Sequence, residues 1–67
     1  MAIDVNSASK TSIKQIFCGT NDDQTDLANK VIKQRYSKRI ANYDELESLV
    51  LEWGGKLDES ARARIKF

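Results

Sequence analysis

Residues 43–55 read YDELESLVLEWGG and form the clearest amphipathic segment of the chain. Their apolar side chains recur on one helical face, at Tyr43, Leu46, Leu49, Val50 and Trp53. Asn42 and Glu45 give the Asn-x-x-Glu pattern of a capping box, so we expect a helix from Asn42 to Trp53. Gly54 and Gly55 end it, because glycine accepts the positive φ of a tight helix exit. Leu51 lies roughly opposite the core face, so packing of this helix against the core does not explain why an apolar residue stands there.

Length and composition indicate one small domain covering residues 1–67. A chain of 67 residues is expected to bury only about 60% of the surface that its unfolded form exposes. It contains no Pro and three Gly, which suits helices. Eleven Lys and Arg against ten Asp and Glu give a net charge of +1. The charge of the whole chain therefore does not favour binding to nucleic acid or to a membrane.

Cysteine usage and hydropathy bear on the compartment. The single cysteine, Cys18, excludes an intramolecular disulfide and fits a reducing compartment. We expect its side chain at the edge of the core. The first residues, MAIDV, lack the basic region and apolar run of a signal peptide, and no apolar stretch approaches the roughly 20 residues of a membrane span. These features predict a cytoplasmic protein that makes no membrane contact.

The segment before residue 20 is expected to hold an arm and one short helix. Residues 1–8 have no helical period and are expected to form a flexible arm, although the alternation of Ile3 and Val5 leaves a short strand as the alternative. Ser9 can cap a helix that runs to Cys18, with one apolar face formed by Ile13, Ile16 and Phe17. Gly19 suits the left-handed position just past its end.

A second helix is expected from Asn21 to about Tyr36. Asn21 and Gln24 resemble a capping box, and the buried stripe is formed by Leu27, Ala28, Val31 and Ile32. At 100° per residue, Arg35 falls in the middle of that stripe. The helix is therefore expected to end or bend between Arg35 and Ile40, or else to hold the charge of Arg35 over the edge of the core.

The segment after Gly55 has two interpretations. Leu57, Ala61 and Ile65 recur at i+4 spacing, which indicates a further helix. The last seven residues, ARARIKF, also alternate between apolar and basic side chains, which is typical of a strand. Ile3–Val5 would be the partner of such a strand. The predicted fold is thus all-α, a small bundle of three to four helices, in which this segment is the fourth helix or instead a short strand.

The sequence offers little for catalysis. There is no His, the commonest general base near neutral pH, and Cys18 lacks the His partner of a nucleophilic dyad. Asp22, Asp23 and Asp26 lack the spacing of a calcium loop. Gly54-Gly55-Lys56 lacks the rest of a phosphate-binding loop. We therefore expect no enzyme, no catalytic residue, no cofactor and no metal site.

Two basic regions are candidates for binding. The segment Lys30–Arg39 holds five basic residues around Tyr36. This combination is expected of a solvated helix end that faces the acidic third helix, and it also suits phosphate contact with aromatic stacking. Residues 43–66 also resemble a degenerate helix-turn-helix whose second helix would carry Arg62 and Arg64. Asp58 and Glu59 count against that interpretation, because they would repel DNA phosphates.

These observations lead to two functional hypotheses. The first is a non-enzymatic protein-interaction module, acting as a regulator, adaptor or stoichiometric inhibitor, whose partner is another protein or a second copy in a homodimer. The alternative is a nucleic-acid-binding regulator that uses Lys30–Arg39 or the helix-turn-helix at 43–66. The candidate contact residues for the two hypotheses are Lys33, Arg35, Tyr36, Lys38, Arg39, Leu51, Arg62 and Arg64.

Overall fold

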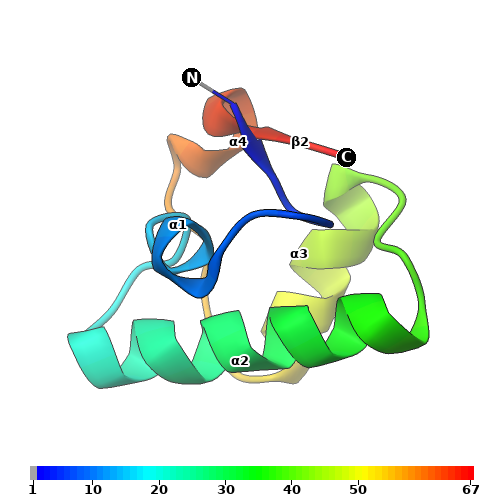
Figure 1. Ribbon diagram of the computed structural model, residues 1–67. Helices are drawn as coiled ribbons and strands as arrows, with labels where there is room; N and C mark the ends of the chain where they lie inside the picture. The colour runs from blue at the N-terminus through cyan, green and yellow to red at the C-terminus, as the bar shows by residue number, and fades with distance from the viewer. Residues whose placement is uncertain (1) are drawn as a thin grey trace.

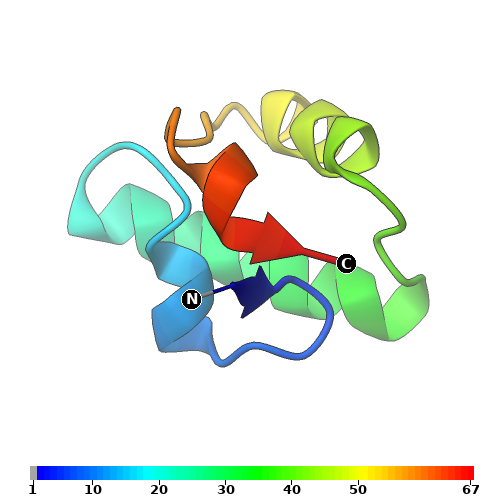
Figure 2. The same ribbon diagram turned by 90° about the horizontal axis from the view of Figure 1, so that it is seen from above.

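The computed structural model describes residues 2–67. Its elements, in order, are β1 (Ile3–Asp4), α1 (Lys10–Lys14), α2 (Asn21–Ser37), α3 (Tyr43–Glu52), α4 (Ala61–Arg64) and β2 (Ile65–Lys66) (Figure 1). The mostly helical fold is confirmed, but a helix bundle is not. Helices α2 and α3 have 17 and 10 residues, whereas α1 and α4 have only 5 and 4. Helix α2 forms one side of the molecule, and the other elements lie across it (Figures 1 and 2).

Side-chain caps fix where the two long helices begin. The sequence placed the cap of α2 at Asn21, but the structure places it one residue earlier, at Thr20. The Thr20 hydroxyl accepts from the Asp23 amide at 3.2 Å, and the Asp23 carboxylate accepts from the Thr20 amide at 3.4 Å. The predicted cap of α3 is confirmed, since Asn42 Oδ1 accepts from the Glu45 amide at 2.9 Å. The reciprocal half of the predicted capping box is absent, because the Glu45 carboxylate accepts from the Ala41 amide at 3.3 Å instead. At the exit of α3, Gly54 has the positive φ expected, 78°.

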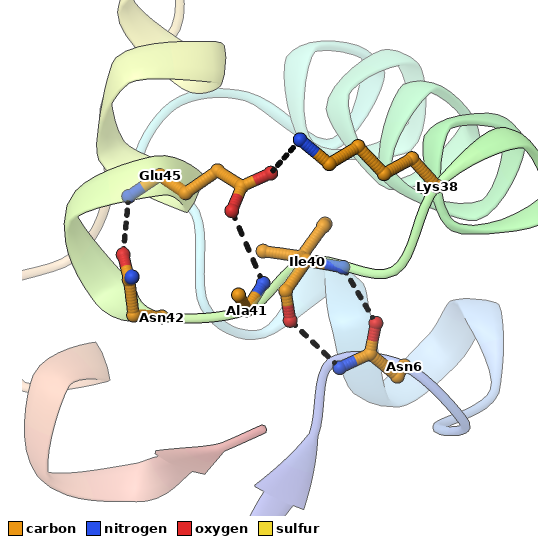
Figure 3. A network of polar contacts seen from close by, with 6 residues as sticks. All are labelled: Asn6, Lys38, Ile40, Ala41, Asn42 and Glu45. Atoms are coloured by element: carbon orange, nitrogen blue, oxygen red, sulfur yellow. Dashed lines mark hydrogen bonds and ion pairs between the residues drawn. The ribbon is translucent and has the colours of Figure 1, made fainter.

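The two ends of the chain meet in a small parallel sheet, in which Ile3 pairs with Ile65. The expectation of a flexible arm is therefore corrected for residues 3–8: the Val5 side chain is fully buried, and its amide donates to the Lys66 carbonyl at 3.1 Å. The side-chain amide of Asn6 also makes two hydrogen bonds with the backbone of Ile40, at 2.9 and 3.0 Å (Figure 3). The pairing proposed for the strand alternative is confirmed.

Pairing between distant segments explains why two expected helices are short. Phe17 forms an antiparallel bridge with Leu57, and the Asp58 amide donates to the Ile16 carbonyl at 2.9 Å. These contacts join the backbone of residues 16–18 to the backbone of residues 56–58. Helix α1 therefore ends at Lys14 rather than Cys18, and the C-terminal segment consists of a loop, a helix of a single turn and a short strand.

One hydrophobic core joins all of these segments. Its fully buried large side chains come from the N-terminal segment, from helices α1, α2 and α3, and from the turns that follow α1 and α2. They are Val5, Ile13, Ile16, Phe17, Val31, Ile40, Leu46 and Val50. Tyr43, Leu49 and Trp53 are half-buried against this core, as the amphipathic pattern of α3 predicted. Cys18 was expected at the core edge, but the structure exposes it.

Candidate functional interaction surface

Arg35 belongs to the fold rather than to a free surface. Helix α2 ends at Ser37, between Arg35 and Ile40 as the sequence predicted, and Arg35 lies in its last turn. Its Nη1 donates to the Val5 carbonyl at 3.2 Å and to the Ala8 carbonyl at 2.7 Å. Arg35 thereby connects the N-terminal segment to α2 through two hydrogen bonds from the Nη1 atom of its guanidinium group.

The other three arginines among the candidates also have partners within the chain. The guanidinium group of Arg39 donates to the Phe67 carbonyl, and Arg64 Nη2 donates to the Gln15 carbonyl at 3.0 Å. The guanidinium carbon of Arg62 lies 4.8 Å from the centre of the Tyr43 ring, within the range of a cation–π contact. Three of the four arginines thus hold together segments that are far apart in sequence, and Arg62 packs on α3.

Lys38 has a partner but remains largely available. Its Nζ lies 3.8 Å from Glu45 Oε1, while Glu45 Oε2 accepts from the Ala41 amide at 3.3 Å (Figure 3). The Lys38 side chain is 74% exposed. An exposed ion pair of this kind contributes about 0–1 kcal/mol, so solvent or a partner can replace it.

Two large hydrophobic side chains are exposed among residues 2–67. Tyr36, near the end of α2, is 85% exposed, and Leu51, near the end of α3, is 66% exposed. The sequence singled out both, because neither fits the core face of its helix. The structure places them on different helices and in surroundings of opposite charge.

Leu51 lies in a groove between α3 and the segment 56–59. We call this the Leu51 groove; its lining residues are Tyr43, Glu47, Val50, Leu51, Lys56, Leu57 and Glu59. Its volume is about 280 Å³, below the roughly 300–1,000 Å³ of typical small-molecule pockets. A groove of this size has room for one or two side chains of a protein segment.

The exposed face of α3 beside the groove is acidic. Asp44, Glu47, Ser48 and Leu51 follow the i, i+3, i+4 and i+7 spacing of one helical stripe, and all four are exposed. Glu59 adds a carboxylate from the opposite wall of the groove, and Lys56 is the basic residue among the lining side chains. The groove therefore combines an apolar floor with a mainly acidic rim.

The exposed face of α2 has the opposite character. We call Ile32, Lys33 and Tyr36 the Tyr36 surface. Ile32 and Tyr36 are one helical turn apart, Ile32 is only half-buried, and Lys33 is exposed between them in sequence. Lys30 and Lys33 also line a shallow hollow beside Trp53. An apolar pair with adjacent lysines thus faces solvent on this side of the molecule.

Sequence reasoning missed the second wall of the groove. The i+4 spacing of Leu57, Ala61 and Ile65 favoured a helix here, and the strand alternative concerned only the last seven residues, so neither pattern placed Leu57 and Glu59 in a loop beside α3. Their true positions depend on the bridge between Leu57 and Phe17, which are forty residues apart in the chain. Within residues 53–67, helix α4 spans a single turn, so the long second helix of a helix-turn-helix does not form there.

Three further findings concern membrane-spanning helices, metal sites and similarity to known proteins. Within residues 2–67, no helix is both long and apolar enough to cross a membrane. No three His, Cys, Asp or Glu side chains in that range gather as metal ligands would. The chain matches no protein-family model, no curated protein and no solved structure.

Proposed function

We propose that this chain is a non-enzymatic protein-interaction module that binds another protein through the Leu51 groove. The observation that carries the proposal is Leu51 itself, 66% exposed at the edge of an apolar groove with charged residues around it. Exposed apolar patches with polar rims are typical of surfaces that bind other proteins. The exposed thiol of Cys18 supports placing the module in a reducing compartment such as the cytoplasm.

The groove specifies the chemistry of the partner segment. Tyr43 and Leu51 offer apolar surface for one large aliphatic or aromatic side chain, and the buried Val50 and Leu57 lie beneath them. Asp44, Glu47 and Glu59 would attract Lys or Arg on either side of that residue and repel acidic segments. The partner is therefore a segment with a large apolar residue flanked by basic residues.

A random peptide library displayed on particles tests this proposal against the full chain. Selection is expected to enrich peptides with a large apolar residue next to Lys or Arg. Their binding should be lost with Leu51→Glu and kept with Ser7→Glu, which adds the same charge at an exposed turn outside the groove. Enrichment of acidic peptides, or equal binding to the two variants, would show that the groove is not the binding surface.

A nucleic-acid-binding regulator is the second candidate, and Tyr36 is the observation that favours it. Its ring is 85% exposed near Lys33 and Lys38, both exposed, which suits stacking on a base with phosphate contacts. Arg35 and Arg39 contribute less, since their guanidinium groups have partners in the fold. Fluorescence anisotropy with a single-stranded oligonucleotide should then show binding that weakens with salt and with Tyr36→Ala. No binding at low salt would remove this candidate.

A further inference from the structure

We propose that the Leu51 groove also accepts a second copy of this chain, through the Tyr36 surface, so that copies associate head to tail. This inference rests on the proposed function, because it uses the same groove. Ile32 and Tyr36 would supply the apolar side chains, and Lys33 would supply the positive charge.

The Tyr36 surface has the chemistry that the groove requires. Tyr36 is the most exposed large hydrophobic side chain in residues 2–67, and Ile32 lies one turn before it on the same helix. Lys33 and the neighbouring Lys30 are exposed. A large apolar side chain with adjacent lysines is what we inferred for the partner of the groove, and this chain carries such a surface itself.

Charge decides between the two ways in which copies could pair. In a two-fold dimer centred on one of the two surfaces, that surface meets itself: Glu47 would face acidic side chains, or Lys33 would face basic ones. Like charges brought together across an interface disfavour both arrangements. Placing the Tyr36 surface of one copy in the Leu51 groove of the next brings Lys33 toward Glu47 and Glu59. The complementary arrangement therefore pairs the two different surfaces, and assemblies larger than two copies distinguish the head-to-tail arrangement from a closed reciprocal dimer.

This arrangement has a consequence for regulation. The two surfaces belong to different elements, α2 on one side and α3 with segment 56–59 on the other. Each copy can then use both at once, and the assembly grows as a chain or closes as a ring. A second copy and the partner protein would compete for the Leu51 groove, so self-association would lower the amount of groove available to the partner.

Sedimentation velocity on the full chain and two variants tests the inference. The mass of the wild-type chain should rise with concentration, while Tyr36→Ala and Leu51→Ala should each raise the dissociation constant at least about tenfold. An equimolar mixture of the two variants keeps one intact interface, between the groove of Tyr36→Ala and the Tyr36 surface of Leu51→Ala. That mixture should form dimers and nothing larger. Both replaced side chains are exposed, and circular dichroism checks that each variant is folded.

Charge reversal gives a second readout. Lys33→Glu should weaken association, and the double variant Lys33→Glu with Glu47→Lys should restore it, because the opposite charges again meet across the interface. A merely structural role of either residue would not produce this recovery, since the two are exposed on separate helices.

Three results would overturn the inference. The first is a wild-type chain that stays monomeric up to about 1 mM at low salt. The second is association that Leu51→Ala abolishes and Tyr36→Ala leaves intact, which indicates a symmetric dimer. The third is a monomeric mixture of the two variants. If the chain is monomeric but selected peptides still need Leu51, the inference fails while the proposed function stands; if peptides bind independently of Leu51, the proposed function fails.

Discussion

Replacing Arg35 tests whether this residue serves the fold rather than a partner. Arg35→Met keeps most of the apolar stem but removes the Nη1 donor that binds the Val5 and Ala8 carbonyls at 3.2 and 2.7 Å. Hydrogen bonds from a charged donor contribute about 1.5–3 kcal/mol each, and these two share one nitrogen at a half-buried site. We expect the free energy of unfolding to fall by about 2–3 kcal/mol.

That loss is large for a chain of this size. At about 0.05–0.15 kcal/mol per residue, 67 residues correspond to a total stability of roughly 3–10 kcal/mol. Urea unfolding followed by circular dichroism at low protein concentration measures the change. Lys33→Met is the matched control: it removes one positive charge from the same helix, at an exposed position, and should change stability by no more than about 0.5 kcal/mol. Equal effects of the two substitutions would refute the assignment of Arg35 to the fold.

Three further predictions concern the contacts that shape the molecule. Asn6→Ala leaves the buried backbone amide and carbonyl of Ile40 without partners, so we expect the free energy of unfolding to fall by about 2–4 kcal/mol and hydrogen exchange at the Ile40 amide to become faster. An exchange rate equal to that of the wild type would contradict this. Gly55→Ala would place a Cβ 2.5 Å from Cδ2 of the buried Leu27, and should lower the urea midpoint by an amount that corresponds to about 1–3 kcal/mol. A stability equal to that of the wild type would mean that the Leu27 side chain moves aside freely. The backbone and side-chain hydrogen bonds from Ser60 hold the pKa of Asp58 below its usual 3.8, so their contribution to stability is present above that pH and is lost as the pH falls through the lowered pKa. In an NMR titration, Ser60→Ala should move the Asp58 pKa upward by a fraction of the full shift, because it removes only the side-chain bond. An unchanged Asp58 pKa would exclude the side-chain bond as a cause.

The four arginines show why binding residues are hard to assign from a pattern of charges. In the sequence, all four arginines lie in basic segments, as Lys33 and Lys38 do, and helical periodicity sets only Arg35 apart by placing it in the buried stripe. In the structure, Arg35, Arg39 and Arg64 donate to backbone carbonyls 27 to 49 residues away, and Arg62 lies over Tyr43. The planar guanidinium group with its several donors suits such multiple contacts better than the ammonium group of lysine. The lysines remain on the surface, and they carry the charge that we assign to binding.

The N-terminal segment shows the limits of local signals in a different way. Residues 1–8 have no helical period, and their short polar residues read as an arm. The structure packs residues 3–8, because Val5 fills the core and Asn6 satisfies the backbone of Ile40. The partners of these residues lie more than twenty-five positions away, in α2, in the α2–α3 connection and in β2, and no spacing within the segment itself reveals them.

The sequence alone determined the two long helices. Periodic apolar positions, the Asn42 cap and the glycine exit of α3 are local features, and each depends on residues within about one or two turns of helix. The surplus Leu51 and Tyr36 were also readable, because helical periodicity alone removes a side chain from the core face. The tertiary structure decided what those side chains meet. The Leu51 groove exists because the bridge between Phe17 and Leu57 holds segment 56–59 beside α3, and the acidic rim faces solvent there while the arginines are used within the fold. Such pairings join residues forty or more positions apart, and their free energy comes from shared burial, which local sequence patterns do not encode.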